Sequence, residues 1–75
     1  MKVSHTLKST EREKLEIVAG LLQQAGYRAG KIDGQTGIHI VRLSREHVSS
    51  EQGERDRIQR IIEHFGIEGW AATFS

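Results

Sequence analysis

Leu21-Leu22-Gln23-Gln24-Ala25-Gly26-Tyr27 has a counterpart forty residues later in the chain, Ile61-Ile62-Glu63-His64-Phe65-Gly66-Ile67. Each segment has the pattern of a helix end, followed by a glycine that can adopt the left-handed conformation and an apolar residue that enters a strand. Two such segments within 75 residues predict a chain in which helices and strands alternate.

Apolar residues at helical spacing precede each of the two glycines. Before Gly26 they form one stripe along the predicted helix, and two further apolar residues widen this stripe to about 200° at 100° per residue, which predicts a substantially buried helix. Before Gly66 they form a second, narrower stripe. Capping boxes at Thr10–Glu13 and at Ser49–Gln52 predict where the two helices begin. The first stripe comprises Leu15, Val18, Ala19, Leu22 and Ala25, widened by Ile17 and Leu21, and the second comprises Ile58, Ile61, Ile62 and Phe65.

Outside the helices, apolar residues alternate with polar ones, as in strands with one buried face. Residues 2–8 follow this pattern with Val3, His5 and Leu7 on one face, and residues 68–74 follow it with Trp70, Ala72 and Phe74.

Between the helices, residues 27–32 and 37–43 flank Asp33-Gly34, which predicts a hairpin. A two-residue turn there places Tyr27 opposite Ile40, Arg28 opposite His39 and Ala29 opposite Ile38. A longer loop through Gln35-Thr36-Gly37 is the alternative, and a slip of one residue reverses every face assignment.

The resulting order is strand, helix, strand, strand, helix, strand. It resembles the ferredoxin-like split βαββαβ fold, an α+β class with a four-stranded antiparallel sheet and two helices on one face. This fold implies that the first and third strands are central neighbours. We expect residues 1–75 to form a single domain, because a chain of this length has room for one core.

Composition excludes several classes of protein. There are no cysteines, so neither disulfides nor thiolate metal sites are available, and 11 basic residues nearly balance 10 acidic ones. No apolar run is long enough for a secretory signal or a membrane span, so we expect a cytoplasmic protein that does not engage membranes.

His5 and His39 are expected on adjacent strands, yet two histidines without a third ligand fall short of a zinc site. We therefore expect no metal, cofactor or catalytic residue.

Both faces of the third strand are apolar, with Ile38 and Ile40 on one and Val41 and Leu43 on the other. A sheet covered by helices on one side has no internal use for a second apolar face. The leading hypothesis is therefore a small non-enzymatic binding or regulatory module whose open sheet face binds a second copy of the chain or a protein partner. ACT-type regulatory domains share this fold and pair through sheets or helices. The candidate binding residues are Arg28, Lys31, Ile38, His39, Ile40 and Arg42.

An alternative follows from Gly37-Ile38-His39-Ile40-Val41-Arg42-Leu43, which resembles the ribonucleoprotein motif of RNA recognition motif domains. The resemblance implies binding of single-stranded RNA or DNA on the open face, here through Arg28, Lys31, His39 and Arg42. Ile38 and Ile40 occupy the positions where that family carries base-stacking aromatic residues.

A third comparison is with HicA-type ribonuclease toxins, which the two helix ends quoted above resemble. Those toxins carry a glycine-serine-histidine run with a catalytic imidazole, and Gly37-Ile38-His39 stands in its place here. The resemblance implies RNA cleavage that depends on His39. Chains of this size are often encoded by phages or plasmids. Such an origin is suggested here by length alone, because no residue of the chain indicates it.

Overall fold

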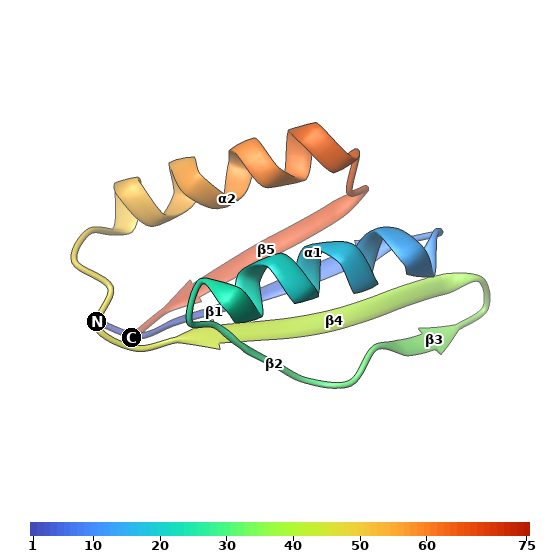
Figure 1. The fold of residues 1–75 in the computed structure, drawn as a ribbon, viewed down its shortest axis with the longest axis horizontal. Helices are drawn as coiled ribbons and strands as arrows, with labels where there is room; N and C mark the ends of the chain where they lie inside the picture. Colours follow the sequence, from blue (N-terminus) through green and yellow to red (C-terminus); the bar gives the residue numbers. More distant parts are fainter.

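The computed structural model describes residues 1–75, and all of its strands join one antiparallel sheet. The strand order is β2-β4-β1-β5, and β3 pairs with β4 as well. Both helices lie on the same face of this sheet (Figure 1). The predicted ferredoxin-like arrangement is confirmed. The elements are β1 (Val3–Ser9), α1 (Arg12–Gln24), β2 (Arg28–Ala29), β3 (Asp33–Gln35), β4 (Ile38–Arg45), α2 (Glu51–Phe65) and β5 (Gly69–Phe74).

Both helices end where the glycines predicted. Gly26 has φ +96° and Gly66 has φ +67°, a region that side chains with a Cβ rarely enter. After Gly26, the Tyr27 amide donates to the Leu22 carbonyl at 2.9 Å, and after Gly66 the Ile67 amide donates to the Ile62 carbonyl at 3.1 Å. Each bond closes the last turn of its helix and turns the chain back towards the sheet.

The predicted helix starts are less accurate. No capping box forms at Thr10, because its amide and hydroxyl both donate to Glu68, the amide at 2.6 Å. Glu11 precedes α1 instead, and its own side chain caps nothing. The cap of α2 lies one residue later than predicted, where the Ser50 hydroxyl accepts from the Gly53 amide at 3.0 Å.

The predicted hairpin exists, but its turn and register were wrong. The turn lies at Thr36-Gly37, with φ of +48° and +83°, and Asp33-Gly34 belongs to β3. Positive φ at both central residues is what a tight type I′ turn requires. The Asp33–Ile40 pairing follows, while β2 pairs Arg28 with Ser44 and Ala29 with Leu43. This register places Ala29 and Leu43 on the helix side, where both pack in or against the core.

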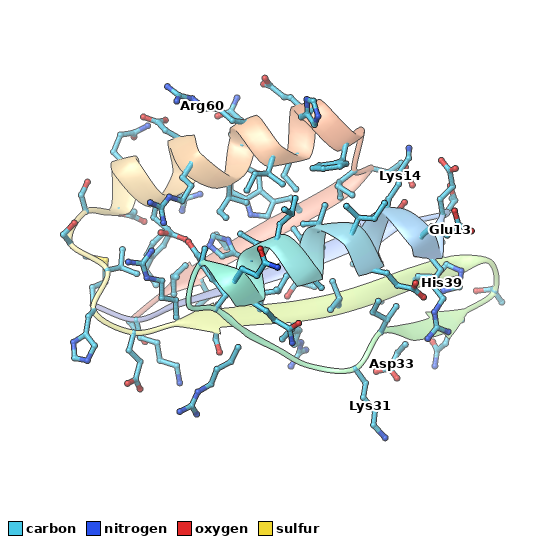
Figure 2. All side chains as sticks on the ribbon, in the orientation of Figure 1. Glu13, Lys14, Lys31, Asp33, His39 and Arg60 are labelled. Carbon is cyan, nitrogen blue, oxygen red and sulfur yellow. The ribbon has the colours of Figure 1, made fainter.

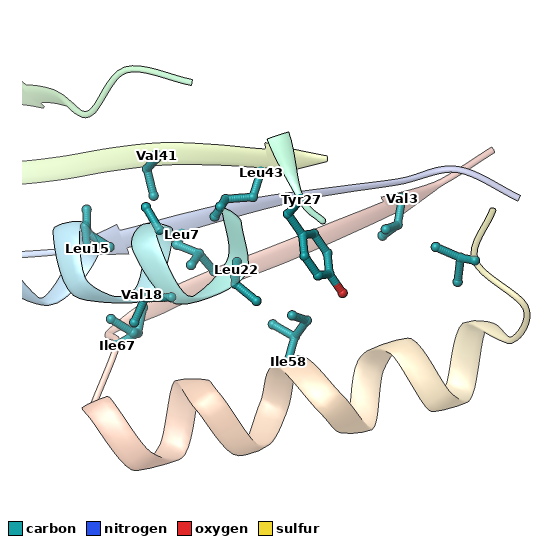
Figure 3. Close-up of a cluster of buried hydrophobic side chains, with 12 residues drawn as sticks. Val3, Leu7, Leu15, Val18, Leu22, Tyr27, Val41, Leu43, Ile58 and Ile67 are labelled. Atoms are coloured by element: carbon teal, nitrogen blue, oxygen red, sulfur yellow. The ribbon is translucent and has the colours of Figure 1, made fainter. Parts of the chain in front are cut away.

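The core lies between the sheet and the two helices (Figure 3). α1 is buried only along the residues that face the sheet, so the prediction that Ile17 and Leu21 are buried was wrong: they remain 53% and 45% exposed. Neither helix combines the length and the apolarity needed to cross a bilayer. The buried apolar residues are Val3, Leu7, Leu15, Val18, Ala19, Leu22, Tyr27, Val41, Leu43, Val48, Ile58 and Ile67.

Candidate functional site

The face of the sheet opposite the helices is uncovered (Figure 1). Because side chains alternate along a strand, β4 sends Val41 and Leu43 into the core and Ile38, Ile40 and Arg42 to the open side. The register carries the open face across the central strands, since Thr6 of β1 pairs with Arg42. The structure thus confirms that the third predicted strand has two apolar faces and places one of them in solvent.

Positive charge collects on this open face. Five basic side chains lie on it or at its border, and none of them is within ion-pair distance of a carboxylate. Asp33 is the one carboxylate on the strands of this face, and Glu46 follows the end of β4. Figure 2 shows Lys31 and Asp33 pointing away from the helices. The five basic residues are Lys2, Lys8, Arg28, Lys31 and Arg42.

The open face contains two adjoining depressions of about 410 Å³ each. One is lined by Lys31, Asp33 and Ile40, and the other by Lys2, Arg28 and Ser44. Gly30 and Arg42 line both. Arg42 therefore lies between the two hollows, with basic groups on either side.

His39 does not belong to this surface, contrary to the sequence hypothesis that grouped it with Arg28, Lys31 and Arg42. It pairs with Ser9 of β1 and shares the helix side of β4 with Val41. Its imidazole covers Gly34, where a Cβ would meet Nδ1 at 2.8 Å, and that nitrogen is shielded with no hydrogen-bond partner. His39 therefore does not lie with the basic residues with which the sequence hypothesis grouped it.

His5 and His39 also do not meet. They are on adjacent strands and on the same side, but His5 is opposite Leu43, four residues along from the Ser9–His39 pair. At a rise of roughly 3.3 Å per residue, this separates them by about 13 Å. No group of three or more potential metal ligands occurs in the structure.

His5 instead occupies the centre of a buried polar network. The Trp70 indole Nε1 donates to His5 Nδ1 at 3.1 Å, so the proton of the neutral ring is on Nε2, which donates to Glu54 Oε2 at 2.8 Å. The Tyr27 hydroxyl donates to the same carboxylate oxygen. Figure 3 shows the Tyr27 ring between the sheet and α2, with its oxygen towards the helix.

These contacts govern how Glu54 and Tyr27 ionise. Burial on its own raises the pKa of the Glu54 carboxyl, but hydrogen bonds from Tyr27 and His5, together with the nearby Arg45, outweigh it and hold that pKa below its ordinary value. Burial, and then the bond to Glu54, raise the pKa of the Tyr27 phenol. Arg45 lies over the Tyr27 ring at 5.5 Å. Glu54 is thus a buried carboxylate balanced by donors and one adjacent cation.

The role that this network supports is structural. Its members come from β1, the entry to β2, α2 and β5, and they hydrogen-bond to one another, so the network ties the sheet to α2. Sequence reasoning missed Glu54, Tyr27 and Trp70 as a group. The signal was present, because Glu54 lies four residues before Ile58 on the buried stripe of α2, and His5 alternates with two buried residues.

No protein-family model matches the chain, and no curated protein sequence matches it. Among solved structures, the chain is similar to the crystal structure of formyltetrahydrofolate deformylase from Burkholderia mallei ATCC 23344, with a TM-score of 0.58 and 20% sequence identity. The match covers 96% of this chain and 27% of that protein, so the chain spans about a quarter of the deformylase. At this identity the likeness supports the ferredoxin-like fold alone.

Proposed function

We propose that this chain is a non-enzymatic binding module that uses the open face of its sheet to bind an acidic protein partner. The observation that carries the proposal is the segregation of charge: five basic groups without ion pairs lie on or beside the uncovered face that carries Ile38 and Ile40, although the whole chain carries a net charge of only +1. Such a surface attracts acidic partners over roughly a Debye length of about 8 Å at physiological salt.

The apolar residues favour a protein over a simple polyanion. Ile38 is 45% exposed, and Ile40 on the same strand lines the hollow that Arg42 borders. An aliphatic centre with a charged rim is the usual make-up of a protein interface. Hydroxyls of Ser4, Thr6 and Ser44 flank this centre and can accept or donate hydrogen bonds to a partner backbone.

The fold adds support of a coarser kind. The resemblance in element order to ACT-type domains and the likeness to one segment of a larger enzyme both agree with a small module that binds rather than catalyses. We further propose that binding of the module regulates the activity of that acidic partner.

Single-stranded nucleic acid is the second candidate partner, and the unpaired basic groups favour it as well. Phosphate contacts by Arg28, Lys31 and Arg42 would supply affinity that falls steeply with salt. The open face carries no aromatic ring, so the base stacking that RNA recognition motifs use is missing. We therefore place nucleic acid second.

The test is a selection from a displayed random-peptide library on the purified protein, with counter-selection on an Ile40→Ser, Arg42→Glu double variant. We expect the selected peptides to be rich in Asp and Glu interspersed with aliphatic residues, and to bind the double variant at least tenfold more weakly. Lys14→Glu is the matched control, because it reverses a charge on the helix side, where Lys14 pairs with Glu11 at 2.9 Å.

Fluorescent dodecamers of uridine and thymidine form the second arm of this experiment. Peptides without acidic bias, or with equal affinity for the double variant, would refute the acidic-partner proposal. Nucleic acid becomes the better assignment if a dodecamer binds the open face more tightly than any selected peptide and weakens with salt on a log–log slope near −2 or steeper.

A further inference from the structure

The two edges of the sheet differ in how they are protected. β5 forms one edge, and its only neighbours are β1 and α2. Its sequence, Gly69-Trp70-Ala71-Ala72-Thr73-Phe74, contains no charge and no proline. Natural sheets commonly protect an edge strand with such residues or with bulges, because an unprotected edge pairs readily with another chain.

The hydrogen-bond pattern shows which groups of β5 are free. Lys2 and Ser75 exchange two backbone hydrogen bonds, each 2.9 Å long, so they form a hydrogen-bonded pair. In an antiparallel ladder such pairs recur every second residue, so Gly69, Ala71 and Thr73 also bond to β1. The N–H and C=O groups of Trp70, Ala72 and Phe74 therefore point away from the sheet.

We infer that the free edge of β5 is a homodimerisation site, at which β5 of a second copy pairs antiparallel about a two-fold axis through Ala72. In this register Ala72 faces Ala72 of the second copy, and Trp70 faces its Phe74. Three residues in each copy contribute one donor and one acceptor each, so all of the outward groups of β5 are satisfied by six hydrogen bonds.

Side chains support the same register. Trp70 and Phe74 are both half-buried on the helix side of β5, so the symmetric pairing places two Trp–Phe cross-strand pairs on either side of the small central alanines. Aromatic cross-strand pairs are among the favourable contacts of antiparallel sheets. On the open side, Ala71 faces Thr73 of the second copy, and no like charges meet within the paired strands.

The opposite edge does not offer a comparable template. It is divided into β2, with two residues, and β3, with three, and Gly30, Lys31 and Ile32 separate them. Arg28, Lys31 and Asp33 add charges to it. A second copy is favoured at β5 over an arbitrary extended peptide, because the strand is complementary to itself in both hydrogen bonding and aromatic placement.

Light scattering coupled to size-exclusion chromatography tests the inference, with Ala72→Pro as the key variant. The proline removes a donor that β1 does not use, a position at which edge strands tolerate proline. We expect the natural sequence to have a mass of about 17 kDa at micromolar concentration, twice the 8.5 kDa of one chain, and Ala72→Pro to remain monomeric to at least tenfold higher concentration.

Two further measurements keep the result unambiguous. A synthetic chain with N-methylalanine at position 72 removes the same donor and keeps the alanine side chain, so monomers of both variants with native circular dichroism exclude misfolding as the cause. In a mixed isotope-labelled sample, an intermolecular Hα–Hα contact between Ala71 and Thr73 would identify the register, since these residues form a non-hydrogen-bonded pair.

Lys31→Pro on the opposite edge is the matched control, because the Lys31 amide makes no backbone hydrogen bond, and we expect it to remain dimeric. A natural sequence that stays monomeric at millimolar concentration, or a folded Ala72→Pro variant that still dimerises, would overturn the inference. Dimerisation at β5 is independent of the open face: the Ile40→Ser, Arg42→Glu variant should dimerise normally even where it loses its partner.

Discussion

The two faces of this sheet are built from the same strands, yet their side chains differ in how they are partnered. On the covered face, β1 and β4 present aliphatic side chains and His5, whose network with Glu54 is fully hydrogen-bonded. On the open face, the alternate positions of the same strands present Thr6, Ile40 and Arg42, none of which makes a side-chain hydrogen bond or ion pair within the chain. Residues of the covered face are required for stability, so substitutions on the open face are the better test of binding.

The largest effect on stability is expected at Glu54, the buried carboxylate of the covered face. Glu54→Ala leaves the Tyr27 hydroxyl and the His5 Nε2–H buried without an acceptor, which should cost about 3 kcal/mol of unfolding free energy. Urea denaturation followed by circular dichroism measures it.

The matched control is Asp56→Ala on the exposed side of α2, where the lost partner is the solvent-exposed Gln52. We expect that control to stay within about 0.5 kcal/mol of the natural sequence. Equal effects of the two substitutions would show that the polar network does not stabilise the fold.

The next effect compares two aliphatic residues of β4 that point to opposite faces. Val41 is 1% exposed, and its replacement by alanine should cost about 2 kcal/mol through lost burial and an unfilled cavity. Ile38 is 45% exposed, and the same replacement there should cost less than about 1 kcal/mol, chiefly from its cross-strand contact with Gln35.

Thermal or urea unfolding of the two variants gives the comparison directly. A larger loss at Ile38 than at Val41 would contradict the assignment of the two faces. Ile38→Ala should instead weaken the acidic peptides selected on the open face.

The smallest expected effect is a dependence on pH. Because the folded-state pKa of Glu54 lies below the ordinary value of 4.5, its ionised form adds stability that is fully present above that value and is lost as the pH falls through the folded pKa. Glu54→Gln removes this titration and keeps the shape of the side chain. The stability difference between the natural sequence and Glu54→Gln should therefore shrink as the pH is lowered from 6 towards 3.

Urea midpoints measured at half-unit intervals of pH follow that difference, and Asp56→Asn serves as the control on the same helix. A difference that stays constant or grows towards acid would show that the Glu54 carboxylate is not stabilised by its donors.

Much of this architecture could be predicted from local signals. The glycines at positions 26 and 66 end both helices because only they adopt positive φ there at little cost, and period-two alternation located β1 and β5. Where the signals competed, local reasoning failed: Asp33-Gly34 is a strong turn pair, but the turn lies at Thr36-Gly37. The pairing of Ala29 with Leu43 is also offset by one residue from the register that this turn sets for β3, and no local pattern contains that offset.

The candidate site was predictable in part, for the same reason. Alternation from Val41 and Leu43 placed Ile38, Ile40 and Arg42 on the open face, but His39 was misplaced because it was grouped by chemistry and not by its position along the strand. The buried network depends on Trp70 and Glu54, which come from distant parts of the chain. Such a contact follows from the packing of α2 over the sheet, and no local pattern contains it.

The paired residues at the two chain ends have a practical consequence. Lys2 and Ser75 are bonded side by side at one corner of the sheet (Figure 1), so a short linker can join them without disturbing any strand. A circularly permuted chain opened beside the exposed Lys31, between β2 and β3, should then fold to the same sheet. Fluorescent labels attached to the new chain ends would then lie at the β2–β3 edge, and the corner formed by Lys2 and Ser75 would carry none.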